Sequence, residues 1–214
     1  MTAPRTINGV PVWRTMRRTP APGIASDHAP IVIVGAGPVG LALALDLGRR
    51  GNKVIVVTAF EFIARGSKAI CFSKRSLEIF DRLGVGARVR DKGVRWEKGK
   101  VFWKDLPEPI YEFDLLPVKA QKNPAFVNIQ QYYVEEYLIE TIAEHPSIEI
   151  RWGHRVTGVR QSEHAVFLSV STQEGDYDIS ADFVAACDGV RSTIRKAMDL
   201  DFVGRVFEDN FLIA

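Results

Sequence analysis

The feature that most constrains the fold is a short β-branched run followed directly by a glycine-rich turn. Ile31-Val32-Ile33-Val34 has no polar alternation, which favours a strand buried on both faces, as in a parallel sheet. The turn Gly35-Ala36-Gly37-Pro38-Val39-Gly40 opens a segment rich in Leu and Ala that should form a helix over residues 39–50, ended by Gly51. A second β-branched strand follows at residues 53–57. The sequence therefore predicts a strand–turn–helix–strand unit with a right-handed crossover.

The rest of the chain predicts further elements of an α/β protein. Ser73 can cap a helix that runs to about Leu83 and stops at Gly84, and a second helix over residues 131–145 should end at Pro146. Short strands and turns interrupt the α/β pattern over residues 94–117. The remaining strands are expected at residues 148–152, in a small antiparallel meander over 156–180, in a buried strand at 183–187, and in an apolar strand at 210–214 that stops without a partner.

Composition excludes several classes of protein. The 214 residues are 46% hydrophobic and 25% charged, an ordinary globular balance for one large domain or one and a half. The net charge is only +2, and the first 30 residues contribute four arginines against one aspartate. The near-neutral remainder argues against a nucleic-acid partner, whose affinity comes mainly from phosphate neutralisation. No apolar run reaches the roughly 18 residues of a membrane span, and the amino terminus has no apolar signal segment.

Cysteine and histidine spacing offers no metal or disulfide framework. Cys71 and Cys187 have no CxxC pattern, so we expect buried thiols of a reducing, cytoplasmic compartment. The four histidines show no ligand spacing either, which predicts no metal site. Four prolines interrupt residues 1–29, which we expect to form a flexible or loosely docked arm.

The glycine-rich turn is a candidate dinucleotide-binding site. Gly35 would allow the tight turn, Gly37 would let the backbone approach a pyrophosphate, and Gly40 would let helix and strand pack closely. The amino end of the helix offers unpaired N–H groups and a positive dipole end to phosphate. A glycine turn without a ligand is the alternative. The buried strand before the turn and the helix after it favour the dinucleotide.

The end of the second strand departs from this fingerprint. An acid about 20 residues after the glycines is expected to bind the ribose hydroxyls, but this chain has Thr58. A threonine hydroxyl can bind ribose, although a neutral hydrogen bond is weaker than a charge-assisted one. Two interpretations stay open: Glu61 substitutes for the acid from the loop, or the affinity for the cofactor is reduced.

A second candidate motif spans residues 187–195. A buried strand delivers Asp188 and Gly189 to its carboxyl end, where ligands of open α/β sheets bind. Ser192 can cap the helix that follows. Taken alone, this segment is also explained by an Asp-Gly turn and an ordinary helix cap.

The two motifs in order, GxGxxG and then DGxxSxxR, resemble the group A FAD-dependent aromatic monooxygenases, the relatives of para-hydroxybenzoate hydroxylase. Two further segments agree. Residues 65–73 with 76–79 resemble the family's second FAD segment, in which Lys68 stands where an arginine is usual near the pyrophosphate; lysine keeps the charge but loses the bidentate fork. Residues 130–138 resemble the segment whose glutamine contacts FAD, with Gln131 in that position. The resemblance covers residues 30–214.

The resemblance implies FAD as the cofactor, NADH or NADPH as the reductant, and transfer of one oxygen atom from O₂ to a small phenolic substrate. Lys68 and Gln131 would hold the phosphate and ribityl side. Asp188 and Gly189 would serve both flavin and nicotinamide nucleotide, with Arg195 supporting their loop. The implied cofactor contacts are Gly35, Ala36, Gly37, Pro38, Val39, Gly40, Thr58, Lys68, Ala69, Gln131, Val156, Asp188, Gly189 and Arg195.

The family's third FAD motif, a Gly-Asp pair, and most of its substrate domain do not occur in these residues, so the resemblance is to an N-terminal part and we name no catalytic residue. Other functions remain open. An NAD(P)-dependent dehydrogenase would leave Gln131 and Asp188 without a function. A truncated, non-catalytic remnant or an excised domain is consistent with Thr58 and the missing motif. A partner-binding module would rest on the four arginines of the arm alone.

These inferences predict the α/β class: a Rossmann-like FAD-binding domain of three layers, with a parallel sheet and a β-meander, plus part of a β substrate domain. The expected division is a flexible arm over residues 1–29, the FAD-binding domain over 30–94 and 125–200, and the partial substrate domain over 95–124 and 201–214. Aromatic residues of the inserted segment could belong to a core or line a substrate pocket: Trp96, Trp103, Tyr111 and Phe113.

Overall fold

The computed structural model describes residues 5–7, 10–12, 27–61, 63, 70–116, 118, 120–205 and 207–208. Lys68 and Ala69 of the expected cofactor site lie outside the described residues, as does the strand expected at 210–214. Within the expected arm, β1 (Arg5–Ile7) and β2 (Val10–Val12) pair antiparallel.

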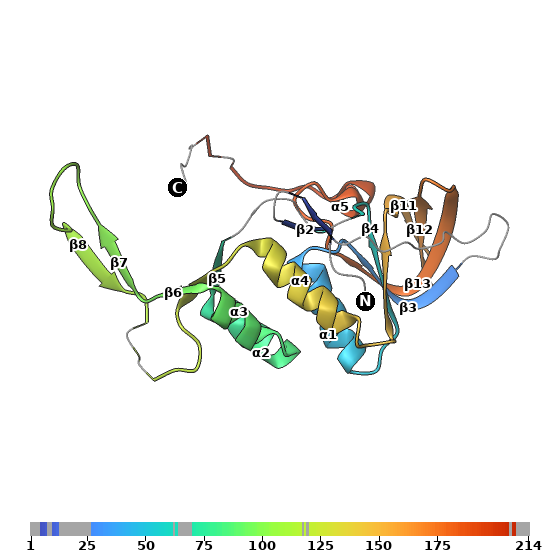
Figure 1. The fold of residues 1–214 in the computed structure, drawn as a ribbon. Coiled ribbons are helices and arrows are strands. Elements are labelled where there is room, and N and C mark those ends of the chain that lie inside the picture. Colours follow the sequence, from blue (N-terminus) through green and yellow to red (C-terminus); the bar gives the residue numbers. More distant parts are fainter. Residues whose placement is uncertain are drawn as a thin grey trace.

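The predicted strand–turn–helix–strand unit is confirmed at the centre of the sheet (Figure 1). β3 (Asp27–Val34) leads through the glycine turn into α1 (Pro38–Arg49), and β4 (Val54–Thr58) lies parallel beside β3. Every residue of β4 is buried, as the β-branched run requires. Gly51 takes a φ of 86° just past α1, a conformation that glycine adopts without steric cost.

Six strands form one sheet in the order β10-β4-β3-β13-β12-β11. The first four run parallel, and β12 and β11 extend the sheet antiparallel as the predicted meander. The strands added to the central unit are β10 (Ile148–Trp152), β11 (Arg155–Gln161), β12 (Val166–Ser171) and β13 (Asp176–Ala186).

The structure corrects two expectations about β13. The last strand of the meander and the buried strand expected at residues 183–187 are one continuous strand, because its first half pairs with β12 and its second half with β3. Phe183 is 72% exposed rather than buried. It pairs with Ile31 on the face turned towards the helices, and α1, which packs on β3, β4 and β10, does not cover it.

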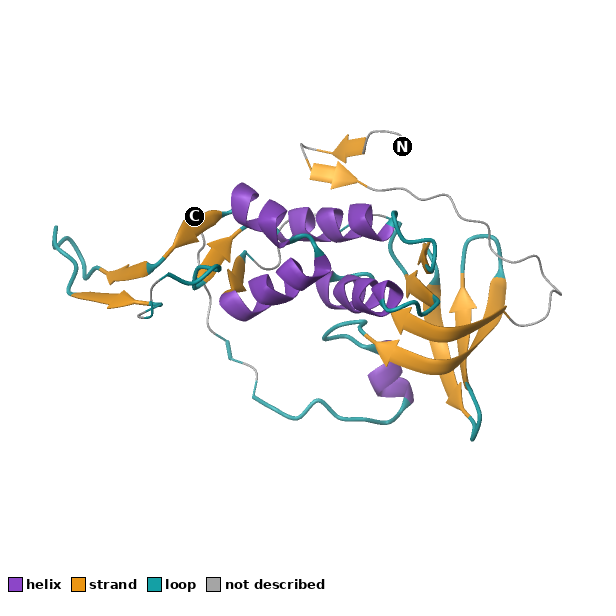
Figure 2. Ribbon diagram, turned by 90° about the horizontal axis from the view of Figure 1, so that it is seen from below, coloured by secondary structure: helices purple, strands orange, loops and turns teal. Residues whose placement is uncertain are grey.

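The molecule has three layers: the long helices, the parallel strands, and the meander, which curls back over the parallel strands. One apolar core lies on each side of the parallel strands, and the long helices lie together on one side (Figure 2). The first core lies between the parallel strands and the helices α1 and α4 (Gln131–Ile142), and includes Ile33, Leu45 and Leu138. The second lies between the parallel strands and the meander. It includes Val57, Val156 and Leu168, and β11 approaches β4 across it. This burial supplies most of the folding free energy.

Helix α4 ends three residues before the expected His145. A turn begins after Ile142, and the amide of Ile148 donates to the carbonyl of His145 at 3.0 Å as the chain enters β10. The turn therefore redirects the chain before Pro146 is reached.

A second group of elements packs beside α4. α2 (Lys74–Leu83) begins after Ser73 and ends at Gly84 with a φ of 88°, as predicted. The Ser73 hydroxyl lies 3.4 Å from the Ser76 hydroxyl and makes no backbone cap. The other elements of this group are α3 (Gly86–Lys92) and a small antiparallel sheet of β5 (Cys71–Ser73), β9 (Phe126–Asn128) and β6 (Val94–Trp96).

A polar cluster ties α2 to α3 and to the segment before β9. Arg90 donates to Asp81 and to Asn123 at 2.7 Å each, and Asn123 donates back to Asp81 at 2.9 Å. Burial pushes the pKa of Asp81 upward, but the hydrogen bonds from Arg90, Asn123 and Lys122 outweigh it and hold this pKa below its ordinary value. The carboxylate is therefore stabilised in its charged form.

The inserted segment contains a hairpin, β7 (Lys98–Val101) with β8 (Tyr111–Asp114), that projects away from the body of the molecule (Figure 1). Trp103 and Tyr111 are 59% and 60% exposed, so they belong to neither core. Tyr111 stacks on Phe113 with ring centroids 5.6 Å apart. Trp96 stacks instead on Phe126 of the small sheet.

Candidate functional site

A cavity of about 650 Å³ opens at the carboxyl ends of β3, β4 and β13, the edge at which open α/β sheets bind ligands. Its wall is built from the glycine turn, the end of β4, the first turn of α4, the corner between β10 and β11, and the loop after β13. The predicted cofactor residues that line it are Gly35, Ala36, Gly37, Thr58, Gln131, Val156, Asp188 and Gly189.

Other predicted residues do not line this cavity. Pro38 begins α1, Val39 is 71% exposed, and Gly40 is buried against the turn. Arg195 lies on α5 (Thr193–Ala197) and its Nη1 donates to the carbonyl of Val190 at 2.9 Å. It therefore holds the loop after β13 in place, which is the function that the family resemblance implied for it.

The three motif glycines have three different surroundings. Gly35 has a φ of 109°, and a Cβ there would collide with the carbonyl of Cys187. A Cβ on Gly40 would collide with the carbonyl of Gly35, because α1 packs that closely on the turn. A Cβ on Gly37 would meet nothing within 4 Å. Gly35 and Gly40 are thus required by the fold itself, whereas Gly37 leaves open space in the cavity wall.

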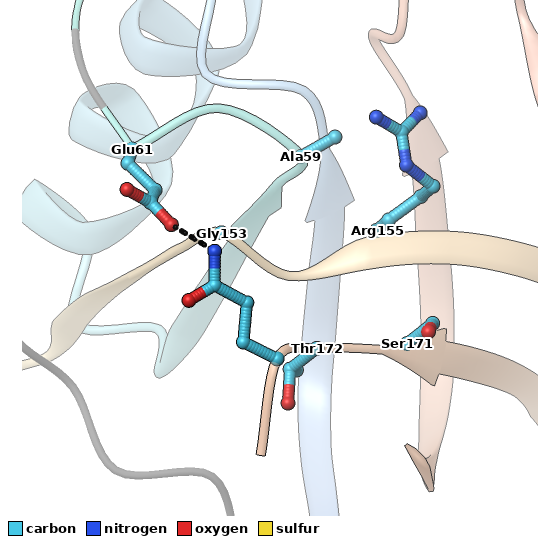
Figure 3. Close-up of a pocket in the computed structure, with 7 residues that line it drawn as sticks. Ala59, Glu61, Gly153, Arg155, Ser171 and Thr172 are labelled. Carbon is cyan, nitrogen blue, oxygen red and sulfur yellow. Dashed lines mark hydrogen bonds between the residues drawn. The ribbon is translucent and has the colours of Figure 1, made fainter. Parts of the chain in front are cut away.

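Thr58 and Glu61 lie in different places. Thr58 is 5% exposed and lines the cavity, and its hydroxyl accepts from the amide of Phe60 at 3.4 Å. Glu61 lines an adjoining pocket of about 250 Å³, where Gln173 donates to its carboxylate at 3.2 Å (Figure 3). The fingerprint position therefore holds a hydroxyl, and Glu61, the next acid along the sequence, lines the adjoining pocket.

The first turn of α4 places a carboxylate in the cavity that sequence reasoning missed. Gln131 donates from Nε2 to Oε1 of Glu135 at 2.7 Å, and both side chains line the cavity. Glu135 is only 2% exposed. The available signal was that Glu135 follows Gln131 by four residues, because residues four apart share one face of a helix.

Asp188 has a structural function in the loop after β13. One carboxylate oxygen accepts from the Ser192 hydroxyl at 2.6 Å, and the other accepts from the amides of Thr193 and Ile194 at 2.6 and 3.2 Å. The Ser192 hydroxyl accepts from the amide of Arg195 at 2.9 Å, which confirms the predicted cap. Asp188 and Ser192 together satisfy the amino end of α5.

The two cysteines differ from the expectation of buried thiols. Cys71 is exposed, and Cys187 is partly buried and lines the cavity beside the glycine turn. Burial, together with the negative charge of Asp188, raises the pKa of the Cys187 thiol. The thiol therefore stays protonated near neutral pH and is a poor nucleophile.

The corner between β10 and β11 adds residues that the sequence did not identify. His154 is 2% exposed, lines the cavity, and has Nδ1 2.9 Å from the Tyr177 hydroxyl. Arg151 donates to that hydroxyl at 3.2 Å and to Glu149 at 2.7 Å. Burial disfavours the charge of Arg151, but these hydrogen bonds raise its pKa above the ordinary value, so it stays charged. This network holds His154, which lines the cavity, in place.

Trp152 carries an unsatisfied donor. Its indole Nε1 is buried and has no hydrogen-bond partner among the residues that the structure describes, and the side chain lines the cavity. Two arginines, Arg155 and Arg191, are exposed and line the same cavity. The only sequence signal for Trp152 was the predicted end of its strand, because parallel strands end at a common edge.

In the part of the chain that the structure describes, no group of three or more His, Cys, Asp or Glu side chains could hold a metal ion. None of the helices described there is long and apolar enough to cross a membrane.

Comparison with known proteins identifies the family. Residues 28–210 match the family described as FAD binding domain. The chain belongs to this family. The FAD-binding domain family includes group A aromatic monooxygenases among the relatives described below, so the resemblance drawn from the motifs is confirmed.

The relatives of this FAD-binding domain are monooxygenases. It is 30% identical over 189 residues to para-nitrophenol 4-monooxygenase of Pseudomonas sp. (strain WBC-3), covering 85% of this chain and 45% of that protein. It is 29% identical over 195 residues to pentachlorophenol 4-monooxygenase of Sphingobium chlorophenolicum, covering 90% of this chain and 35% of that protein. The chain therefore spans less than half the length of these relatives.

Solved structures show the same fold. The p-nitrophenol 4-monooxygenase PnpA of Pseudomonas putida DLL-E4 superposes with a TM-score of 0.80 at 29% identity, covering 86% of this chain and 46% of that one. The flavin-dependent monooxygenase PieE, solved with FAD and substrate, superposes with a TM-score of 0.77 at 25% identity, covering 85% and 34%. The predicted α/β fold class is confirmed.

Proposed function

We propose that the chain binds FAD in the cavity and forms the FAD-binding part of an NAD(P)H-dependent monooxygenase that hydroxylates a small phenolic substrate. One observation carries this proposal: the glycine turn, Gln131 and the Asp188-Gly189 loop, three motifs far apart in the sequence, line one cavity. An NAD(P)-dependent dehydrogenase would need only the glycine turn, and no observation favours it.

The residues present fit a dinucleotide. Gly37 leaves space for a ligand where a side chain would intrude. Trp152 offers a buried N–H that has no acceptor within the described part of the chain, and an unsatisfied buried donor costs about 1–3 kcal/mol. FAD carries phosphate, ribose and flavin oxygens, any of which could accept that hydrogen bond. The exposed guanidinium groups of Arg155 and Arg191 add positive charge beside an anionic ligand.

A bound flavin would supply the redox chemistry, with NADH or NADPH as the reductant and O₂ as the source of the transferred oxygen. The chain's own residues would bind and orient it. The amides at the amino end of α1 would face the pyrophosphate. Gln131, held by Glu135, would present its side chain along one wall. Asp188 would act indirectly, by holding the Gly189 loop in place through its cap of α5.

The division into domains follows from this assignment. The core residues lie in the proposed FAD-binding segments, 30–94 and 125–200, except for Ala29. The expected arm over residues 1–29 is therefore too long at its end, because β3 begins at Asp27 and buries Ala29 in the second core. The projecting hairpin of β7 and β8 lies outside both cores (Figure 1). We assign residues 95–124, with 201–214, to the beginning of a substrate domain. Its substrate class is taken from the phenols named for the relatives.

The test is to mix the purified chain with FAD, pass it through a desalting column and record its absorbance spectrum. Bands near about 375 and 450 nm that stay with the protein are expected, because these are the flavin's own absorbance bands. A folded protein that elutes colourless would contradict FAD binding.

A second measurement addresses the reaction. Oxidation of NADH or NADPH by the FAD-loaded chain would be followed with and without a phenol, and the products would be analysed for a new hydroxyl group. A chain that retains FAD but forms no hydroxylated product would support the alternative of a non-catalytic FAD-binding fragment and would contradict hydroxylase activity for these 214 residues.

A further inference from the structure

The hairpin of β7 and β8 carries its side chains on two chemically different faces. Successive side chains of a strand point to opposite faces, and residues paired across an antiparallel ladder share one face. The charged face holds four residues in two pairs of opposite charge: Lys98 with Asp114 and Lys100 with Glu112. The apolar face holds the other four: Gly99 with Phe113 and Val101 with Tyr111. The hairpin is therefore amphipathic, although it stands apart from both cores (Figure 1).

The apolar face is built around two stacked rings. The Phe113 ring lies over Gly99, where a Cβ would come within 2.1 Å of a ring carbon. Tyr111 stacks on Phe113 with ring centroids 5.6 Å apart. The missing side chain at Gly99 therefore lets the two rings lie along the strands. Val101, which is 41% exposed and pairs with Tyr111, extends this apolar surface.

The apolar face is open to solvent in the part of the chain that the structure describes. Among the elements described there, β7 and β8 pack chiefly on each other, and Tyr111 is 60% exposed. The turn between the strands adds four apolar residues that are each more than half exposed: Phe102, Trp103, Leu106 and Ile110. A two-stranded hairpin alone is marginally stable at best in water, and large exposed apolar patches mark interaction sites. The hairpin therefore has the properties of a docking surface.

The exposed apolar area is close to what a stable dimer needs. An aromatic side chain buries about 150–250 Å², and the exposed rings of the hairpin show more than half of their surface. Together with the aliphatic residues, the hairpin and its turn offer on the order of 500 Å² of apolar surface. A standard protein–protein interface buries about 800 Å² on each partner, of which a little over half is apolar.

The charges of the hairpin decide how two copies of it can meet. Pairing along two β7 edges would set the lysines of one copy beside those of the other, and pairing along two β8 edges would do the same for the acids. Like charges opposite each other destabilise a sheet, so both edges resist self-association. On the charged face, Nζ of Lys100 lies 3.0 Å from Oε1 of Glu112, which neutralises this pair within one copy. The apolar face is therefore the surface of the hairpin that favours contact.

We propose that two copies of this chain associate through the apolar face, hairpin on hairpin, about a two-fold axis. Both copies offer the same uncharged face, so the surface is complementary to itself, as the interface of a two-fold dimer requires. Stacked sheets pack about 10 Å apart with interdigitating side chains. The rings of Tyr111 and Phe113 from the two copies would fill this space. A net charge of only +2 opposes the association weakly.

The experiment measures the mass of the 214-residue chain by sedimentation equilibrium over a range of concentrations. The wild type should approach twice the mass of one chain at about 200 µM and dissociate on dilution. Tyr111→Thr should raise the dissociation constant of the dimer more than about tenfold, because each dimer loses two central rings. Trp103→Thr should weaken the dimer in the same direction, and it lies beyond the β7–β8 ladder, whose residue pairs it leaves intact.

Phe183→Thr is the matched control. Phe183 is 72% exposed on β13, outside the hairpin, so this variant removes an exposed ring elsewhere and should leave the dissociation constant unchanged. Thermal unfolding of dilute, monomeric Tyr111→Thr should match that of the dilute wild type, because the hairpin contributes to neither core. A change in association without a change in unfolding distinguishes an interface from a purely structural role.

Each other outcome contradicts the proposal. A wild type that stays monomeric at about 200 µM shows that a second copy does not cover the apolar face. Protection of the β7 and β8 amides from hydrogen exchange in that monomer would identify a cover within the chain instead. A dimer that persists in both Tyr111→Thr and Trp103→Thr, or that Phe183→Thr dissociates, places the interface elsewhere. FAD binding enters none of these outcomes, because the hairpin does not line the cavity.

Discussion

The carboxylate of Asp188 accepts a hydrogen bond from the backbone amide of Thr193 at 2.6 Å. The acid of the second sequence motif therefore anchors the helix that follows it, α5. The same side chain accepts a hydrogen bond from the Ser192 hydroxyl at 2.6 Å. Both carboxylate oxygens are therefore engaged within the loop. This explains how an Asp-Gly pair can shape the cavity edge even where the carboxylate itself does not reach a ligand.

We expect Asp188→Ala to destabilise the chain by about 1–2 kcal/mol, the usual cost of losing a helix cap. The variant leaves the amides of Thr193 and Ile194 without their acceptor. Urea denaturation measures the change in the free energy of unfolding. Asp188→Asn retains one acceptor oxygen and should recover part of the loss; equal stability of wild type and Asp188→Ala would refute the cap.

Alanine at two glycines of the same turn should have opposite consequences. At Gly40 the new Cβ meets the Gly35 carbonyl, so Gly40→Ala should cost about 1–3 kcal/mol of stability. At Gly37 the Cβ meets open space and φ is −79°, so Gly37→Ala should fold as well as wild type. It should nevertheless bind FAD more weakly, because the methyl group projects where the backbone approaches the pyrophosphate.

Thermal unfolding and FAD titration of the two variants check this pair. A Gly37→Ala chain with unchanged FAD affinity would show that the open space at Gly37 is not the phosphate position. A Gly40→Ala chain as stable as wild type would show that the close packing of α1 on the turn relaxes without cost.

Trp152→Phe should separate stability from cofactor affinity. The change removes an indole N–H that has no partner, which offsets the lost packing, so the cofactor-free chain should change in stability by less than about 1 kcal/mol. Loss of the donor should weaken FAD binding about fivefold, the value of one ordinary hydrogen bond. Fluorescence titration with FAD measures this effect.

Trp96→Phe is the matched control for Trp152→Phe. The indole of Trp96 donates to Asn128 at 3.0 Å, outside the cavity. Its removal should cost about 0.5–1.5 kcal/mol of stability and leave FAD affinity unchanged. If Trp152→Phe binds FAD as tightly as wild type, its N–H does not contact the cofactor.

The cluster around Asp81 should make stability fall at acid pH. Its pKa is lower in the folded chain than in the unfolded chain, because Arg90 and Asn123 donate to the carboxylate and outweigh the opposing effect of burial. The stabilisation is therefore complete above the ordinary aspartate pKa of about 3.9. It is lost as pH falls from there through the folded-state value.

Urea denaturation of wild type and Asp81→Asn between about pH 2 and pH 7 checks this dependence. The variant should be less stable at neutral pH by about 1–3 kcal/mol, and the difference should shrink towards low pH. Asp105→Asn, at an exposed position of the inserted segment, should leave the pH dependence unchanged. A difference that stays constant with pH would contradict the ionic origin.

The local patterns of the sequence determined the elements and much of the cofactor site. A β-branched run with no polar alternation has no stable place except a buried strand, which predicted β3 and β4. Glycines at fixed spacing between strand and helix predicted the tight turn at Gly35 and the close packing of helix and strand at Gly40. Gly84 and Ser192 marked a helix end and a helix start because capping depends on neighbouring residues alone.

The tertiary structure alone decided which distant residues share the cavity. Trp152, His154 and Arg155 reach it because β10 pairs with β4 and ends at the same edge. The pairing of β13 with two different strands merged two expected strands into one. It also decided that Thr58 and Glu61, three residues apart, line separate pockets. Such placements depend on contacts between segments far apart in the chain, and the free energy of those contacts leaves no trace in the local pattern of either segment.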